Sequence, residues 1–218
     1  LAVGLFMKID QVMLREMVGN KAVGIYSAAT RISEVWYFIP AIIVSSVSPS
    51  IIEAKKINEI LYYQRLKIFF NLMAGLAFAI AIPITFLSRP LVLLLFGESY
   101  AAASPVLAIH IWAVFFVFVA TAQRPWDIAE GLMKLSLKRT LIGAVVNIIL
   151  NIILIPLYSS IGAAISTVVS YAFSAFLANI INDKSRRIFF LQAESIFFVR
   201  YFKQIIVKNL LILYERKT

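Results

Sequence analysis

Long apolar runs, separated by short polar segments, dominate the pattern of hydrophobic and polar residues along this chain. Two of the runs contain no Asp, Glu, Lys or Arg: IFFNLMAGLAFAIAIPITFLS and PVLAIHIWAVFFVFVATA. As α-helices they are long enough to cross a hydrocarbon layer of about 30 Å. They are apolar on every face, whereas the strands of a membrane barrel alternate apolar and polar residues over about ten positions. The pattern therefore predicts membrane-spanning helices.

The same pattern predicts an all-α integral membrane protein, with a bundle of six transmembrane helices in residues 1–182. Polar and charged segments at 53–67 and 124–139, together with the short turn LYSSI, connect the predicted helices. The spans are about 1–18, 22–48, 68–88, 105–122, 140–156 and 162–182. Because the chain begins at Leu1 inside an apolar stretch, we expect further residues before it.

Residues 183–218 form a basic tail in which polar residues recur at near-helical spacing among apolar ones. These polar residues are Gln192, Arg200, Lys203, Gln204 and Lys208. The cations in the middle of this segment disfavour insertion across a membrane. We therefore expect a cytoplasmic amphipathic helix that lies in the membrane interface, with a seventh span or a contact with another chain as the alternatives.

Basic residues are distributed unequally between the two sets of alternate connections. One set, with the start of the tail, carries Lys55, Lys56, Arg65, Lys67, Arg124, Lys134, Lys138, Arg139, Lys184, Arg186 and Arg187, and the other carries Arg15, Lys21 and Arg89. Because cytoplasmic loops are enriched in Lys and Arg, this contrast predicts that both termini are cytoplasmic. The net charge of +10 is then mainly a topology signal, with some attraction to anionic lipid, and no nucleic-acid partner is expected.

The composition agrees with a membrane protein and narrows its chemistry. Hydrophobic residues make up 61% of the chain and charged residues 15%, against about half and a quarter in soluble domains. Cysteine is absent, so neither a disulfide nor a thiolate metal site can form. The sequence contains no H-E-x-x-H, Gly-rich phosphate loop, G-x-S-x-G or acidic cluster with metal-ligand spacing. We therefore expect a protein that is not an enzyme and that needs no cofactor.

Charged residues within the first two predicted spans are the candidates for a functional site. They are Lys8, Asp10, Arg31 and Glu34, and each charge costs about 2.5–3.5 kcal/mol on membrane-insertion scales. Arg31 and Glu34 are three residues apart and so can pair on one helix face. Asp10 points nearly opposite to Lys8, so we expect its partner on another helix.

These four charges have two interpretations. They can pair with one another to fix helix packing, or they can line a hydrophilic cavity that binds an anionic head group. We favour the cavity, in which Lys8 and Arg31 suit a diphosphate, the arginine as a bidentate fork and the lysine as a point charge.

Other polar residues in the predicted spans and connections are interpreted as structural. His110 is expected to be a hydrogen-bonded packing residue, and Asp127 a solvated residue of a cytoplasmic connection. Small and amide residues recur every four positions at Gly143, Asn147 and Asn151, and at Gly162, Ser166, Ser170, Ser174 and Ala178. Such stripes are typical of close helix packing in membranes.

Three blocks of the sequence resemble the polysaccharide and O-antigen flippases. They are KIDQVMLREMVGNKAVGIYSAATRISEVWYFIP, LFGESYAAASPVLAI and NIILNIILIPLYSSIGAAISTVVSY, and together they cover most of residues 7–172. Ser159 stands where that family usually has Gly. The resemblance implies the multidrug/oligosaccharidyl-lipid/polysaccharide exporter superfamily, whose members resemble two six-helix lobes around a central cavity, and this chain matches the second lobe.

The resemblance also implies a function and a location. The expected substrate is an undecaprenyl-diphosphate-linked oligosaccharide, moved by alternating access across a bacterial inner membrane, and the expected partners are membrane lipid and the missing N-terminal lobe. One alternative is a cation-coupled multidrug exporter of the same superfamily, which would need acidic cavity residues. Another is a membrane-embedded glycosyl or acyl transferase, which would need an acid or histidine dyad near one membrane face.

Overall fold

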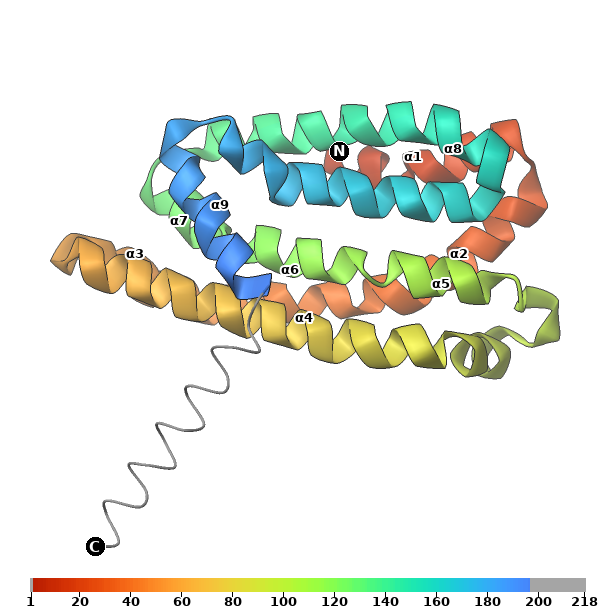
Figure 1. Ribbon diagram of the computed structural model, residues 1–218, viewed down its shortest axis with the longest axis horizontal. Helices are drawn as coiled ribbons and strands as arrows, with labels where there is room; N and C mark the ends of the chain where they lie inside the picture. The colour runs from red at the N-terminus through yellow and green to blue at the C-terminus, as the bar shows by residue number, and fades with distance from the viewer. Residues whose placement is uncertain (1, 197–218) are drawn as a thin grey trace, which may run out of the picture.

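A computed structural model describes residues 2–196 of the chain, with side chains from residue 8 onward. This part is built of α-helices and short 3-10 helices, and it contains no strand. The helices run roughly along one common direction as a bundle, with the connections gathered at its two ends (Figure 1). The expected all-α class is therefore confirmed for the described residues.

The first helices form a hairpin and then a long, interrupted span. Helix α1 (Ala2–Met17) turns at Gly19, whose φ of 110° favours glycine, into α2 (Asn20–Glu34). A 3-10 turn, η1 (Val35–Tyr37), joins α2 to α3 (Phe38–Ile57). Pro40 lies four residues after Trp36 and has no N–H to bond its carbonyl, which explains the break in the α-helical ladder.

Helix α4 (Glu59–Phe96) runs the full length of the bundle. It begins after Asn58, whose side chain accepts a hydrogen bond from the backbone N–H of Ile60 at 2.7 Å and so caps the helix. It ends at Gly97, which has a φ of 79°. The chain then returns through η2 (Glu98–Tyr100), α5 (Ala103–His110), α6 (Ala113–Ala122) and α7 (Arg124–Ala129).

Helix α8 (Met133–Ala175) is a hairpin of two antiparallel arms, which Figure 1 shows side by side. The reversal lies at Ser159, inside the predicted turn, with a φ of 51° and a ψ of −131°. The arms approach so closely that a Cβ added to Gly143 would lie 2.6 Å from the Cβ of Ser174. This contact confirms the packing role predicted for the small residues. After the second arm come η3 (Leu177–Ile180) and α9 (Asp183–Ile196).

Four helical runs are long and apolar enough to cross a membrane, so this is a multi-pass membrane protein. The runs are Asn20–Ile57, Glu59–Phe96, Ala103–Ala129 and Met133–Ile180. Helix α1 has 16 residues and is not among them, and the predicted spans 140–156 and 162–182 merge in the last run. The number six therefore stays a prediction. The polar connections predicted at 53–67 and 124–139 are mostly helical, because the adjoining helices continue into them.

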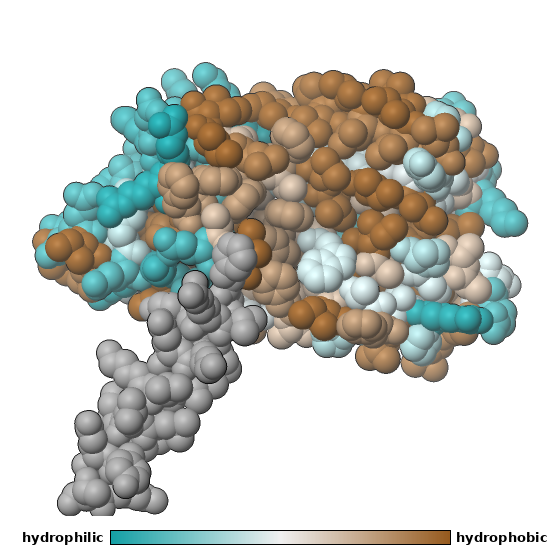
Figure 2. Space-filling model, viewed as in Figure 1, coloured by the Kyte–Doolittle hydropathy of each residue, from teal (hydrophilic) through white to brown (hydrophobic). Residues whose placement is uncertain are grey.

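The surface separates into an apolar body and a polar end. Apolar side chains project from α4 and from the first arm of α8, and Phe86 and Leu94 are each 81% exposed. Hydrophilic residues gather at the end formed by α3, α7 and the start of α9 (Figure 2). Two ion pairs join separate segments at this end: Lys55 of α3 to Glu130, in the turn after α7, at 2.9 Å, and Arg187 of α9 to Glu59 of α4 at 3.0 Å. Lys55 and Arg187, two of the basic residues predicted to face the cytoplasm, thus lie at the same end of the bundle.

Helix α9 packs on the protein with part of its polar side inward. Ile188 and Gln192 are fully buried, and Lys67 of α4 forms an ion pair with Glu194 at 2.6 Å. The residues on which the predicted interfacial helix depends, Arg200, Lys203, Gln204 and Lys208, lie outside the described residues. The interfacial location of the tail stays a prediction.

Candidate functional site

The four predicted site residues lie on neighbouring helices but in different environments. Asp10 of α1 is only 4% exposed, and Glu34, at the end of α2, is half-buried. Lys8 and Arg31 are exposed. The charge of Glu34 interacts with both Lys8 and Asp10, so three of the four residues act on one another. Within residues 8–196 the predicted Arg31–Glu34 ion pair is not formed.

Asp10 is held by side chains of three other helical segments, as its direction on α1 predicts. The hydroxyls of Tyr26 in α2 and of Thr167 in the second arm of α8 donate to its Oδ2 at 2.9 and 2.8 Å. The Nδ2 of Asn151, in the first arm of α8, donates to its Oδ1 at 2.6 Å. Asp10 therefore ties α1 to α2 and to both arms of α8.

All these donors are neutral, and no described lysine or arginine forms an ion pair with Asp10. The Oδ1 of Asn151 is buried and has no hydrogen-bond partner, although buried polar atoms in proteins are nearly always satisfied. The Oδ1 of Asn147 lies 3.2 Å from the Nδ2 of Asn151. Carboxylate, amide and hydroxyl oxygens thus gather in one buried place, which is a suitable environment for a small hard cation.

The stripe that contains Asn147 and Asn151 predicts helix packing with asparagine hydrogen bonds between helices, and Asn151 forms such a bond, whereas no pattern in the sequence singles out Thr167. The hydrogen bonds of Asn151 and Thr167 to Asp10 span 141 and 157 residues of sequence, a separation that helical periodicity cannot predict. The sequence contains only an indirect signal for this cluster. Asn147 and Asn151 are four residues apart on one face of an apolar helix, and Asp10 is expected to find its partner on another helix. His110 is the hydrogen-bonded packing residue that was predicted, with its Nδ1 2.7 Å from the Oγ of Ser33.

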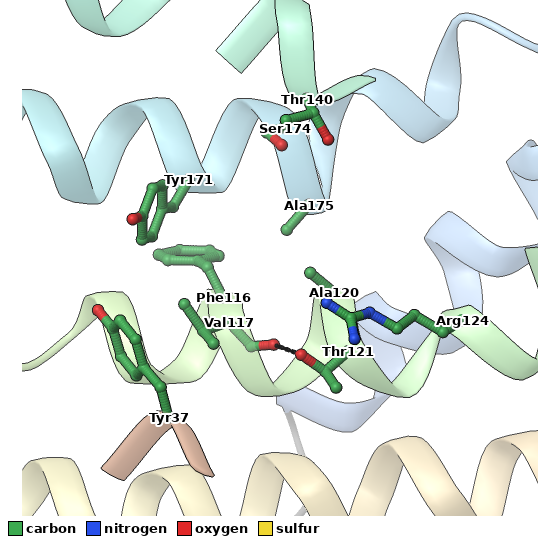
Figure 3. Close-up of a pocket in the computed structure, with 10 residues that line it drawn as sticks. All are labelled: Tyr37, Phe116, Val117, Ala120, Thr121, Arg124, Thr140, Tyr171, Ser174 and Ala175. Carbon is green, nitrogen blue, oxygen red and sulfur yellow. Dashed lines mark hydrogen bonds between the residues drawn. The ribbon is translucent and has the colours of Figure 1, made fainter. Parts of the chain in front are cut away.

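A cavity of about 180 Å³ lies beside this cluster, between α6 and the second arm of α8. Figure 3 shows the rings of Tyr37, Phe116 and Tyr171 around one end of it and the side chain of Arg124 at the other. Tyr171 stands four residues after Thr167 on the second arm of α8, so this aromatic end of the cavity lies one helical turn from the candidate site.

Asp127 corrects a prediction. We expected a solvated residue, but it is only 2% exposed, and both of its carboxylate oxygens accept hydrogen bonds from Nη2 of Arg139 at 2.6 Å. Arg139 is also buried, and its Nη1 donates to Oδ1 of Asn179 at 2.9 Å. Trp126 and Pro125 of the same short helix are buried with Asp127, which explains why this polar segment turns into the protein.

Three buried amides extend this ion pair to α9. The side chains of Gln123, Asn179 and Gln192 lie within 3.0 Å of one another and hydrogen-bond in a ring. They come from the junction of α6 and α7, from η3 and from α9. This amide cluster fastens the polar end of the bundle and the first part of the tail.

Comparison with known proteins agrees with this architecture. The model of the family "Lipid II flippase MurJ" matches residues 11–216. A probable flippase of Haloferax volcanii, AglR, is 26% identical over 182 residues, which cover 78% of this chain and 36% of that protein. An uncharacterized membrane protein of Methanocaldococcus jannaschii is 35% identical over 94 residues, which cover 42% of this chain and 18% of that protein.

The chain thus spans about a third or less of the length of these relatives. No solved structure matches it. The family match extends over nearly all of the sequence, from the second half of α1 to the tail, and it includes Arg31 and Glu34 but begins one residue after Asp10. The resemblance to exporters of lipid-linked substrates is confirmed at this level. The chain belongs to the lipid II flippase MurJ family.

Proposed function

We propose that this chain forms one lobe of a transporter that flips lipid-linked oligosaccharides across the bacterial inner membrane for surface polysaccharide synthesis. The family and the flippase relative support a lipid-linked substrate, and undecaprenyl diphosphate is the expected carrier. In this proposal α1, three apolar runs and the two arms of α8 make six crossings, with both termini cytoplasmic. This chain is then the second lobe, and the proposed partner is an N-terminal lobe of the same protein.

The exposure of Lys8 and Arg31 carries this proposal. Arg31 lies on a helical run that can cross the membrane, Lys8 lies on α1, the first of the proposed crossings, and neither forms an ion pair with a described residue. A lone charge facing lipid is unfavourable by several kcal/mol, so these two side chains must face water, a partner lobe or an anionic ligand. A diphosphate between the two lobes satisfies them, with Glu34 and Asp10 close by to balance the charge.

The oxygen cluster at Asp10 suggests how transport is driven. A proton needs one carboxylate oxygen, whereas a metal cation needs several oxygen ligands, and here Asn147, Asn151 and Thr167 can supply them. One carboxylate balances one positive charge. We infer that a small monovalent cation, sodium in the simplest case, binds at Asp10 and couples its gradient to flipping.

Replacing Arg31 tests the substrate site. In the full-length protein, reconstituted in vesicles with a fluorescent lipid-linked oligosaccharide, Arg31→Ala should slow flipping by about tenfold or more, because a charge-assisted hydrogen bond is worth about 1.5–3 kcal/mol. Arg31→Lys should retain part of the rate, since it keeps the charge without the fork. Arg89→Ala, which removes an exposed cation of α4, is the matched control. An unchanged rate in Arg31→Ala would refute this site.

Replacing Asp10 tests the coupling. Asp10→Asn keeps an acceptor for Tyr26 and Thr167, while Asn151 can turn its oxygen toward the new amide, so the fold should survive. Flipping by this variant should no longer respond to a sodium gradient. Glu53→Asn, at an exposed position of α3, controls for loss of a negative charge. A response that follows the proton gradient alone in the parent protein would replace sodium by a proton.

The multidrug exporter remains the competing function, because Asp10 and Glu34 could bind a cationic drug. The nearby Lys8 disfavours it through like-charge repulsion. Export of a cationic dye by the reconstituted protein, without flipping of the lipid-linked sugar, would decide for the drug exporter.

A further inference from the structure

We propose that Tyr26, His110 and Ser33 form a relay that transmits occupation of Asp10 to the 3-10 turn η1, which adjoins Arg31 and Glu34. The inference rests on the proposed cation site at Asp10, and it adds the route by which that site controls the substrate residues. In it, His110 and Ser33 are positioning residues, because they touch neither the cation nor the substrate.

The relay begins at the hydroxyl of Tyr26, which is buried between two partners. It donates to Oδ2 of Asp10 at 2.9 Å, and it lies 3.0 Å from the Oγ1 of Thr167. When a cation takes the carboxylate oxygen and the threonine hydroxyl as ligands, the tyrosine has to give up or redirect its hydrogen bond. Cation binding at Asp10 therefore first displaces the side chain of Tyr26.

The ring of Tyr26 passes this displacement to His110 on α5. The two rings are packed edge to face, with centroids 5.8 Å apart and planes at 87°. His110 is 1% exposed and Ser33 is fully buried, so both side chains are surrounded by protein. The hydrogen bond of 2.7 Å between Nδ1 of His110 and Oγ of Ser33 then links the imidazole to α2. Close-packed side chains move together rather than compress.

The relay ends at η1, where the α-helical hydrogen bonding between α2 and α3 is interrupted. Ser33 lies two residues before η1, and 3-10 turns inside longer helices often mark hinges. The Nε1 of Trp36 and the hydroxyl of Tyr37, both in this turn, are buried without hydrogen-bond partners among the described residues. A second conformation of the turn that gives these donors partners would be favoured. Movement at Ser33 thus changes the direction of the side chains of Arg31 and Glu34, which lie in the last turn of α2, before η1.

A nitroxide label on the hinge tests the relay. Val35 is 56% exposed, and the chain has no cysteine, so Val35→Cys can carry the label in the full-length protein with any other cysteines replaced. Sodium should change the label's spectrum in this background. Adding Ser33→Ala, or His110→Phe, which keeps a ring against Tyr26, should reduce the change by about fivefold or more. Sodium binding, measured with the radioactive ion, should stay within about threefold.

Two controls separate the relay from general damage. Ser45→Ala removes an exposed hydroxyl of α3 that bonds only to the carbonyl of Ile42, and it should leave the response intact. A label at Phe86→Cys, far along α4, should not respond. A full response in both relay variants, or no response in the parent while sodium binds, overturns the relay. A normal response in a protein that does not flip lipid-linked sugar refutes the proposed function and leaves the relay standing.

Discussion

Asp10 and Asp127 are both buried, but the lobe neutralises them in opposite ways. Asp127 faces the guanidinium of Arg139, and a ring of amides surrounds the pair. Asp10 has only neutral donors, and an unsatisfied amide oxygen of Asn151 lies beside it. The first cluster lies at the polar end of the bundle, and the second lies within the apolar body. Their difference separates a fixed structural joint from a site that can take up a ligand.

The contrast has a simple electrostatic basis. A buried carboxylate without a nearby cation is unfavourable, so it is retained where another positive charge arrives during function. At Asp127 the guanidinium of Arg139 already supplies the positive charge. The free energy of unfolding of selected variants can distinguish the two kinds of cluster.

Breaking the Asp127–Arg139 pair should have the largest effect. Arg139→Ala leaves the buried carboxylate of Asp127 without its cation, and we expect a loss of about 3–5 kcal/mol, measured by thermal or denaturant unfolding in detergent. The double variant Asp127→Asn with Arg139→Gln should recover a good part of it. Lys55→Ala, which removes the exposed partner of Glu130, should cost no more than about 1 kcal/mol. Equal losses in Arg139→Ala and Lys55→Ala would contradict the ranking.

Removing the centre of the amide ring should have the next largest effect. Asn179→Ala leaves buried groups of Gln123, Gln192 and Arg139 with fewer partners, and we expect a loss of about 2–3 kcal/mol. Helix α9 should then be cut more readily in limited proteolysis, because Gln192 anchors it. Gln64→Ala, which removes an exposed amide of α4, serves as the control. Unchanged protection of α9 would show that the ring does not hold the tail.

Overpacking the contact between the two arms of α8 should have a smaller effect on the free energy of unfolding. Gly143 lies between Arg139 and Asn147 on one face of α8, and a Cβ there would collide with Ser174. Gly143→Ala should destabilise the lobe by about 1–2 kcal/mol, as overpacking does. Ser174→Gly in the same chain should restore stability. If the second change brings no recovery, the arms are not in the contact described.

Neutralising Asp10 should have the smallest effect on stability. Asp10→Asn preserves hydrogen bonds to Tyr26 and Thr167 and removes a buried charge, so we expect the free energy of unfolding, without sodium, to change by less than about 1 kcal/mol. The same melting assay as for Arg139→Ala measures it. A loss near that of Arg139→Ala would make Asp10 a structural residue as well.

The sequence was informative wherever one helix determines the answer. Charge-free apolar runs predicted the helical core, and the turn at LYSSI contains the observed reversal at Ser159. The geometry of α1 predicted that Asp10 would find its partner on another helix, because Lys8 and Asp10 point in nearly opposite directions. The small residues at Gly143 and Ser174 predicted a close contact, which the structure confirms.

The sequence was uninformative where separate elements meet. Nothing local distinguishes Asp127 from a solvated acid, because its cation stands on a different helix and its burial depends on Trp126 packing into the core. The same holds for Gln192, which was assigned to a polar face and is buried against η3. Burial of a polar side chain is a property of the assembled bundle, so hydropathy along the chain does not reveal it.

The reversal at Ser159 divides α8 into two arms that are joined at this residue. Asn151 and Thr167, the two α8 residues that hold Asp10, stand eight residues before and eight residues after it, about 12 Å along each arm. Arg139 stands twenty residues before it, about 30 Å away. Arg139 is hydrogen-bonded to Asn179, just past the second arm, so the joint at the polar end holds the two arms together there. If the arms pivot as rods, any spreading at the level of Asp10 is about 2.5 times smaller than the spreading that this joint permits. A contact far from Asp10 would thus keep the distance between Asn151 and Thr167 nearly constant.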